Sequence, residues 1–415
     1  MKKYWLSIGL SVFIAASIGT YYIGAATREL PEYRMQTVEG DGKEASHLFL
    51  EGSVSRDKMI DQIKIGDGGT AYESRMSTIG KMFDSEYADR NPELAGLIKD
   101  HKGFMRGKKS YNGFYKDERQ LVYAVTKSDG KTSDDGLHRY SLAVSALDLK
   151  SGKEKQFKAA MLGKQRYASM YVIDVQSGED GIKVLVQLDK KPEVYKNGNY
   201  RFESELHVLT VNMDKEGISD DQTIGADSGA DSGKMERYSV PYGGGIELAS
   251  PSSYALVYKT VVKIAKDQDG NEMEQQVGSE IFAYDYANGK LTPILAGSGS
   301  DSGVYRSLAG NAMITMAMKG NALSIGKLEL AKNKESLQFE IPMSLKNITI
   351  DNTQFFIYQS KLYMYVHAGA DHEILVVSLT DGKVLYQGKA TVDGTADEQK
   401  ERLTGLNVYG FYFAS

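Results

Sequence analysis

Apolar and polar residues alternate in short runs along most of the chain, and this period of two is typical of β-strands with one buried face. Turn-forming residues separate the runs. The alternating segments are residues 121–126, 140–149, 182–188, 206–213, 254–264, 281–286, 312–318, 355–358, 362–366 and 374–378. We therefore predict an all-β fold made of many short strands.

One region departs from this pattern and predicts a helix. Asn91 followed by Pro92 is a typical helix start, because Asn caps the first turn and Pro is favoured at the first helical position. The apolar face would comprise Leu94, Leu97, Ile98, His101 and Phe104. We place a helical insertion within residues 84–108, where it should cover one face or side of the β-domain. Residues 219–234 predict a mobile, low-complexity loop, because residues 226–233 are two consecutive copies of Ala-Asp-Ser-Gly.

The N-terminus carries a different pattern. Residues 4–24 contain no charge and follow Lys2 and Lys3. At about 1.5 Å per residue a helix of this length spans roughly 30 Å, the thickness of a hydrocarbon core. Aromatic residues lie at both ends, where the headgroup regions favour them: Tyr4, Trp5, Tyr21 and Tyr22. We predict a transmembrane anchor at residues 1–26 with its C-terminal side outside. A cleaved signal peptide is the alternative, since small residues precede Thr27.

Either reading places the remaining chain outside the cytoplasmic membrane, as a single-pass or secreted protein. The chain has no Cys, which excludes disulfides, cysteine metal sites and a lipid-modified N-terminus and suits a bacterial envelope. We assign residues 27–45 to a stalk that also supplies a first strand, and residues 46–415 to one extracytoplasmic domain. The net charge of −5 is mild and the charges are interspersed, so no nucleic-acid partner is expected.

A hairpin motif recurs inside the β-region. Residues 146–153, 283–290 and 376–383 align without gaps as strand, polar residue, tight turn, Gly-Lys and strand, and two looser copies follow the same plan. Gly or Asn supplies the positive φ that the turn needs, and the polar residue four positions earlier can bond the turn backbone. The turn residues are Asp148, Gly152, Gly217, Asp285, Gly289, Asn333, Ser378 and Gly382.

Repeated four-stranded units with such a hairpin resemble the blades of quinoprotein-like β-propellers over about residues 115–390. The resemblance implies a single β-propeller of about six blades, with five or seven acceptable. It also implies a blade shared by the chain's first and last strands, in which Leu406–Phe413 would pair with residues 47–54.

No motif in the chain predicts catalysis, a cofactor or a metal. Gly130-Lys131-Thr132 lacks the first Gly of a phosphate-binding loop, and the Gly-Ser run at residues 297–303 is not a nucleophile elbow. His367, Asp371 and His372 have no common zinc spacing, and the acidic run at residues 267–274 has its Gly too early for a calcium loop. We interpret all four as turns or loops.

The densest basic stretch of the ectodomain follows the predicted helix and alternates cations with aromatic rings. Its candidate partner-contact residues are Lys102, Phe104, Arg106, Lys108, Lys109 and Tyr111. We predict a membrane-tethered, non-enzymatic binding or scaffold protein whose propeller face meets an envelope protein or anionic polymer. Two alternatives remain open: an accessory or sensor subunit of a membrane transporter or signalling system, and a glycan-active enzyme whose carboxylates converge from distant blades.

Overall fold

The computed structural model describes residues 30–413 except 57–58, 77–91, 131–132, 134–135, 195–199, 202, 229–233, 242–248, 267–271, 295–302, 347 and 350–351. Before residue 30 it describes Leu10, Phe13 and Ile14. Within these residues no helix has the length and apolar character needed to cross a membrane. Apart from those three residues, the predicted anchor at residues 1–26, including Tyr4, Trp5, Tyr21 and Tyr22, lies outside the described residues.

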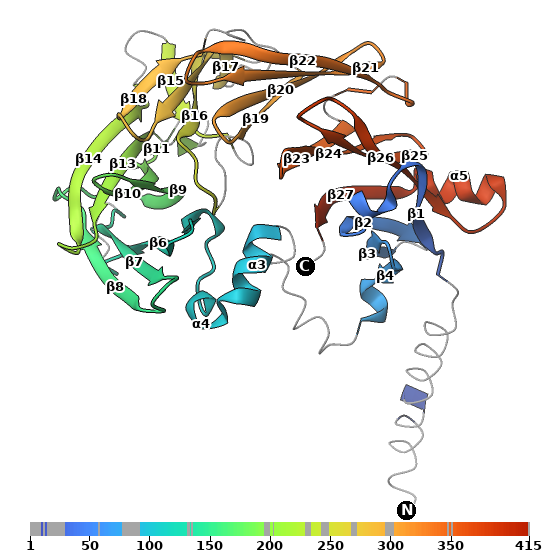
Figure 1. Cartoon of the computed structure of the whole chain (residues 1–415), viewed down its shortest axis with the longest axis horizontal. Coiled ribbons are helices and arrows are strands. Elements are labelled where there is room, and N and C mark those ends of the chain that lie inside the picture. The colour runs from blue at the N-terminus through green and yellow to red at the C-terminus, as the bar shows by residue number, and fades with distance from the viewer. Residues whose placement is uncertain are drawn as a thin grey trace, which may run out of the picture. The chain divides into compact units, whose positions relative to one another are not determined.

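The predicted all-β class is confirmed. Among the described residues, six sheets of four or five strands and one two-stranded hairpin account for most of the chain, with only short helices between them (Figure 1). The chain divides into two compact units. The first comprises Met1–Asn91, Tyr363–Val377 and Lys383–Ser415, and the second comprises Pro92–Leu362 and Ser378–Gly382.

The first unit contains a sheet that joins both ends of the chain. It has the order β27-β2-β3-β4, formed by Leu406–Phe413, Leu48–Arg56, Met59–Gly66 and Gly69–Tyr72. The last strand, β27, pairs antiparallel with β2 from Leu48 opposite Phe413 to Val54 opposite Leu406. The predicted pairing of the first and last segments is therefore confirmed.

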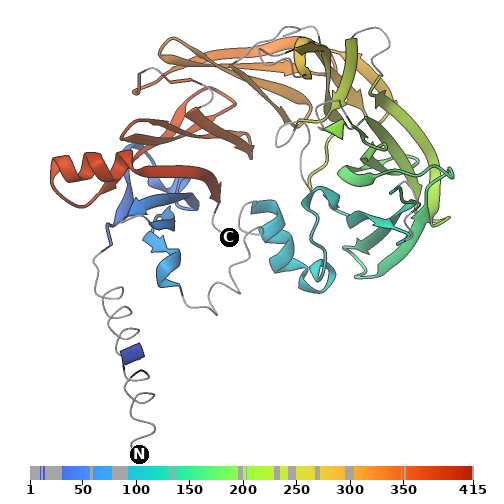
Figure 2. The same ribbon diagram turned by 180° about the vertical axis from the view of Figure 1, so that it is seen from behind.

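A five-stranded sheet has the order β1-β26-β25-β24-β23, formed by Tyr33–Gly40, Val384–Val392, Asp371–Ser378, Lys361–Ala368 and Thr353–Tyr358. The boundary between the units falls inside β24. The short helix η2 (Gly42–Glu44) follows β1, η3 (Glu73–Arg75) follows β4, and α5 (Ala396–Thr404) packs beside β26 and β27 (Figures 1 and 2).

Strand β1 corrects the predicted stalk, because most of residues 27–45 belongs to the folded unit. Tyr33 is only 2% exposed. Its backbone N–H donates to Thr70 Oγ1 at 2.6 Å, and the Thr70 hydroxyl donates to the Tyr33 carbonyl at 2.7 Å. The first-strand part of that prediction is confirmed.

The second unit contains four sheets. Strands β5–β8 are Phe114–Lys116, Gln120–Ser128, Tyr140–Asp148 and Glu154–Ala160. The next sheet, in the order β14-β13-β10-β9, uses Gly217–Ala226, Ser204–Asn212, Gly181–Asp189 and Ser169–Gly178. The small hairpin β11-β12 is Glu193–Val194 with Tyr200–Arg201. Strands β15–β18 are Lys234–Ser239, Tyr254–Lys266, Glu272–Asp285 and Lys290–Pro293, and β19–β22 are Val304–Ala309, Ala312–Lys319, Ala322–Glu329 and Lys334–Pro342.

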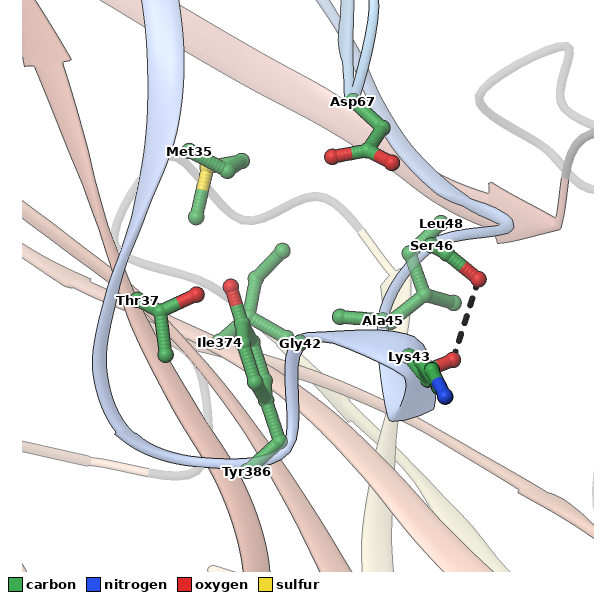
Figure 3. Close-up of a pocket in the computed structure, with 10 residues that line it drawn as sticks. All are labelled: Met35, Thr37, Gly42, Lys43, Ala45, Ser46, Leu48, Asp67, Ile374 and Tyr386. Atoms are coloured by element: carbon green, nitrogen blue, oxygen red, sulfur yellow. Dashed lines mark hydrogen bonds between the residues drawn. The ribbon is translucent and has the colours of Figure 1, made fainter.

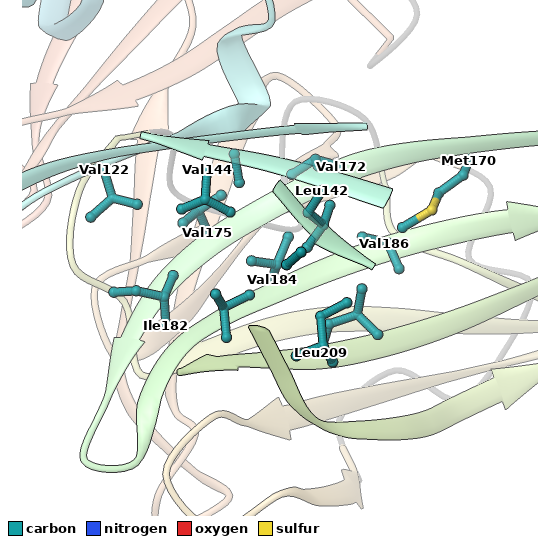
Figure 4. Packing of buried hydrophobic residues seen from close by; sticks show 14 of the residues in the cluster. Val122, Leu142, Val144, Met170, Val172, Val175, Ile182, Val184, Val186 and Leu209 are labelled. Carbon is teal, nitrogen blue, oxygen red and sulfur yellow. The ribbon is translucent and has the colours of Figure 1, made fainter. Parts of the chain in front are cut away.

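Successive sheets of the second unit share apolar layers, which supply most of its hydrophobic stabilisation. Val122, Leu142 and Val144 of sheet β5–β8 pack with Val184 and Leu209 of the next sheet (Figure 4). A second layer joins that sheet to β15–β18 through residues such as Leu206 and Tyr284. A third joins β15–β18 to β19–β22.

The predicted helical insertion is present as α3 (Pro92–Asp100) and α4 (Lys102–Met105), followed by η5 (Tyr111–Gly113). These helices pack on the other face of sheet β5–β8. Leu94, Leu97 and Phe104 form a buried cluster with Leu121 and Tyr123, which alternate along β6 with the residues of the layer in Figure 4. A strand exposes alternate residues on opposite faces, so β6 can serve both layers.

The predicted turns occupy equivalent positions, because each connects the third and fourth strands of a four-stranded meander. Gly152, Gly289, Asn333 and Gly382 have φ of 70°, 67°, 47° and 74°. The predicted role of Gly217 is wrong: Glu216 takes the left-handed conformation, with φ 53°. Asn212, four residues before Glu216, accepts hydrogen bonds from the turn N–H groups. This copy of the turn therefore lies one residue earlier in the chain than the alignment on Gly217 predicted.

The polar residue four positions earlier bonds the turn backbone as predicted. Asp148 Oδ1 accepts from the N–H of Ser151 at 2.6 Å, and Asp285 Oδ1 accepts from Ala287 at 2.9 Å. Ser378 Oγ accepts from the N–H of Thr380 at 3.3 Å. The hydrogen bonds hold the pKa of Asp148 below its usual value. These local bonds explain why the turn is readable from sequence alone.

Two of these glycines should respond differently to a methyl group. A Cβ on Gly382 would lie 2.8 Å from the Phe339 ring, whereas one on Gly152 would meet nothing within 4 Å. Gly152→Ala should cost about 1 kcal/mol from positive φ alone, and Gly382→Ala about 2 kcal/mol or more, because the ring must also move. Urea unfolding of both variants measures this. Equal costs would show that Phe339 yields freely.

The predicted mobile loop at residues 219–234 is wrong for its first half. Gly217–Ala226 forms β14 and pairs with β13. Residues 219–223 are all polar, but β14 lies at the edge of its sheet, and Ile218 and Ile224 supply its buried apolar contacts. The repeat beyond Ser228 lies outside the described residues.

Candidate functional site

The basic segment, defined as residues 99–111, combines an apolar anchor with exposed cations. Phe104 and Met105 are 4% and 7% exposed and hold the segment to sheet β5–β8. Lys102, Arg106 and Lys109 are exposed, as predicted. Among the described residues none of these three side chains has an ion-pair partner, so their charge is available to an anion.

Three residues predicted to contact a partner are instead part of the packing. Phe104 is buried, and Tyr111 packs against the same cluster. Lys108 donates to the carbonyl of Phe104, and its Nζ lies 3.8 Å from the centroid of the Phe104 ring and 3.7 Å from Glu154 Oε1. Burial lowers the pKa of Lys108, opposed by Glu154. Within α3, Ile98 is 38% exposed rather than packed on the sheet.

Local geometry separates these roles. Helix α4 ends at Met105, and Gly107 takes a φ of 78° that lets the chain turn back toward the sheet. The turn leaves Arg106 outside, while the N–H of Lys108 bonds the carbonyl of Met105 at 3.0 Å. Sequence spacing marks this stretch as basic but does not identify Lys108 as its inward-facing member, because Glu154 is distant in the chain.

The histidine pair in the first unit is structural. His372 is 1% exposed, its Nε2–H donates to the Leu403 carbonyl at 2.9 Å, and its Nδ1 accepts from the Tyr365 hydroxyl at 2.6 Å. His367 stacks on it with ring centroids 5.9 Å apart, and Asp371 bonds Lys389. Both ring nitrogens of His372 are engaged. The predicted loop is wrong for these three residues, because His367 lies in β24 and Asp371 and His372 lie in β25. Across the described part of the chain, no three His or acidic residues cluster around a metal position.

A second polar network, which the sequence did not reveal, lies in the second unit. His207 on β13 lies between Asp221 of β14, with Nδ1 to Oδ1 at 2.6 Å, and Glu205, with Nε2 to Oε2 at 3.3 Å. Lys190 bonds Glu205 at 2.9 Å. Burial lowers the pKa of His207, but the two carboxylates outweigh it and raise the pKa. Strand register creates this network, and register is not visible in a local pattern.

The two histidines should give opposite pH responses. Burial lowers the pKa of His372. Its stability contribution is therefore complete above the unfolded pKa of about 6.5 and is lost as pH falls toward the folded value. The raised pKa of His207 makes its contribution complete below about 6.5 and lost as pH rises through the folded value.

Urea unfolding of His207→Gln and His372→Gln between acid and alkaline pH tests these signs. The stability gap between wild type and His207→Gln should narrow as pH rises, and His372→Gln should reduce the acid sensitivity of the first unit. Each linked proton changes stability by about 1.4 kcal/mol per pH unit inside its window. Parallel pH curves for wild type and both variants would contradict the assignments.

Other sequence candidates are not placed. Lys131 and Thr132, residues 295–302 and residues 267–271 lie outside the described residues. Glu274 of β17, at the end of the predicted acidic loop, pairs with Arg237 of β15, two strands away in the same sheet.

Comparisons with known proteins give no family. No family model matches the chain, and no curated protein matches it. Similar solved structures include a luciferin-regenerating enzyme, with TM-score 0.29, 10% identity, and coverage of 75% of this chain and 97% of that one. The Dos1 propeller has TM-score 0.26, 11% identity and coverage of 68% and 72%. TolB from Acinetobacter baumannii has TM-score 0.22, 10% identity and coverage of 80% and 76%. Similarity at this level carries no argument about function.

Proposed function

We propose that this chain is a membrane-tethered, extracytoplasmic, non-enzymatic binding protein of a bacterial envelope, and that its basic segment contacts an anionic polymer. The observation that carries the proposal is that residues 99–111 combine buried apolar side chains with exposed cationic ones. Apolar residues fix the segment to a sheet, while Lys102, Arg106 and Lys109 are exposed without ion-pair partners among the described residues.

The physical argument is electrostatic. Exposed lysine and arginine side chains contribute little to folding, so a group of them on a rigid support is available for binding. Because the contact is made at the surface, it should weaken with salt over the Debye length of about 8–10 Å. The N-terminal anchor predicted from residues 1–26 would hold this surface at the outer side of the membrane. Protease added to intact cells should then cleave the chain outside the membrane and release the domain, while residues 1–26 stay with the membrane.

We further propose that the six sheets are the blades of one propeller, closed by the pairing of β27 with β2. The equivalent third-to-fourth-strand turns support this arrangement. A compact body of the ectodomain's length has a radius of gyration of about 21 Å. Small-angle scattering of the protease-released domain tests it, and a clearly larger value would favour two separate bodies.

The binding test uses the full chain reconstituted in vesicles of neutral lipid, so that contacts with anionic lipid do not contribute to the measured binding. The variant Lys102→Gln/Arg106→Gln/Lys109→Gln should retain a soluble polyanion, such as polyglutamate, roughly tenfold less well at low salt, and the difference should vanish at high salt.

A matched control removes three other exposed lysines, Lys150, Lys153 and Lys158, which changes the net charge equally. This control should bind like wild type, and both variants should unfold at the wild-type urea concentration. If both triple variants lose polyanion binding equally, the effect depends on net charge and not on the basic segment. If Lys102→Gln/Arg106→Gln/Lys109→Gln binds the polyanion like wild type, the basic segment does not contact the polymer.

A further inference from the structure

The first unit contains a pocket of about 210 Å³ that is unrelated to the basic segment. Five elements and one turn supply its walls: β1, η2, β2, β25, β26 and the turn between β3 and β4. Its apolar side includes Met35, Leu48 and Ile374. The volume equals that of about seven waters at roughly 30 Å³ each, below the usual 300–1,000 Å³ of ligand pockets. Only a small molecule fits.

Three oxygen-bearing side chains point into the pocket (Figure 3): Thr37, Asp67 and Tyr386. Tyr386 is 2% exposed, so its phenol is fixed by packing. Burial raises the pKa of Tyr386, the Asp67 charge raises it further, and a hydrogen bond from Thr37 opposes the shift. Thr37 therefore adjoins the phenol oxygen, and Asp67 is near enough to act on it.

Asp67 is the charged member of this group. Among the described residues its carboxylate has no hydrogen-bond donor and no ion-pair partner. Asp67 and Thr37 are exposed to solvent, whereas Tyr386 is buried. In Figure 3 Lys43 lies at the end of the pocket away from Asp67. A single carboxylate with two hydroxyls is too few charged ligands for a metal ion, in keeping with the clustering result above.

We propose that this pocket binds a primary ammonium group carrying a short apolar tail. A primary ammonium has three N–H donors, and the pocket presents three acceptors: the Asp67 carboxylate and the oxygens of Thr37 and Tyr386. Hydrogen bonds between an ionised donor and a carboxylate are the strong ones, so Asp67 should dominate affinity. Met35, Leu48 and Ile374 would cover the tail.

The test is a titration of the full chain in detergent with butylammonium chloride, followed by calorimetry and ligand-detected NMR. Butanol, which has the tail but no charge, should bind at least tenfold more weakly. Asp67→Asn should weaken butylammonium binding roughly tenfold or more, and Thr37→Val by a smaller factor. Asp397→Asn, which removes an exposed carboxylate on α5, should leave it unchanged.

Two further arms separate possible sources of the amine. A blocked lysine amide reports on a peptide side chain, and vesicles rich in an amine-bearing lipid report on a headgroup. If butylammonium binds together with the blocked lysine amide or with the amine-bearing lipid, the site is supported, and the second ligand identifies the natural source of the amine. Failure of butylammonium to bind, or equal binding by Asp67→Asn, would overturn the proposal. Thermal unfolding of each variant verifies that the unit is folded.

Discussion

Removing residues 1–40 should unfold the first unit, whereas removing residues 1–26 should leave it intact. The longer deletion takes away β1, which pairs with β26 from Tyr33 opposite Val392 to Gly40 opposite Tyr386. It also removes Tyr33, which is 2% exposed and bonded to Thr70 on both backbone atoms. Losing a buried aromatic residue costs about 3–5 kcal/mol, before the loss of strand hydrogen bonds. Urea unfolding and circular dichroism measure the effect.

Point variants in the full chain provide the control. Tyr33→Ala should reproduce most of the loss, while Val38→Ala on the same strand should cost less than about 0.5 kcal/mol, because Val38 is 60% exposed. If the 1–40 deletion unfolds like the 1–26 deletion, β1 adds nothing to the unit, and residues 27–45 would be the independent stalk that the sequence predicted.

The repeated turns were predictable because their cause is local. A polar side chain, a left-handed residue and two flanking strands lie within eight positions, and the bonds of Asp148 and Asp285 stay inside that window. The error at Gly217 has a local cause too. Gly is the usual residue at positive φ, but here Glu216 takes that conformation under the constraint of the Asn212 side chain.

The candidate site was only partly predictable, because burial of its members depends on distant residues. The sequence around Lys102 and Lys108 does not distinguish the two lysines, because both belong to the same basic stretch. Only the fold brings Glu154 of β8 and the Phe104 ring to Lys108 and leaves Lys102 outside. The network around His207 and the pocket around Asp67 likewise need strand register and a turn's position in space. Hydrophobic periodicity predicts which face of a strand or helix a residue lies on, but not which distant residues contact it.

Asp227→Ala should destabilise the second unit by about 3 kcal/mol, although this residue lies in a stretch that reads as low complexity. Asp227 is 8% exposed. Its Oδ1 accepts from the N–H of Tyr238 at 2.8 Å and its Oδ2 from the N–H of Ser204 at 3.0 Å, with Arg237 Nη1 at 3.3 Å. The carboxylate therefore joins two adjacent sheets through β13 and β15. Its removal leaves a buried N–H without a partner and weakens a partly buried ion pair.

Asp214→Ala removes a carboxylate of the same type from an exposed turn and should change stability by less than about 0.5 kcal/mol. Asp227→Asn should fall between the two, since its amide oxygen keeps one backbone bond while its NH2 faces the other N–H and the charge opposite Arg237 is lost. Urea midpoints for the three variants give this order. If Asp227→Ala and Asp214→Ala unfold alike, the carboxylate does not hold the sheets together, and their apolar layer, which contains Leu206 and Tyr284, alone accounts for their association.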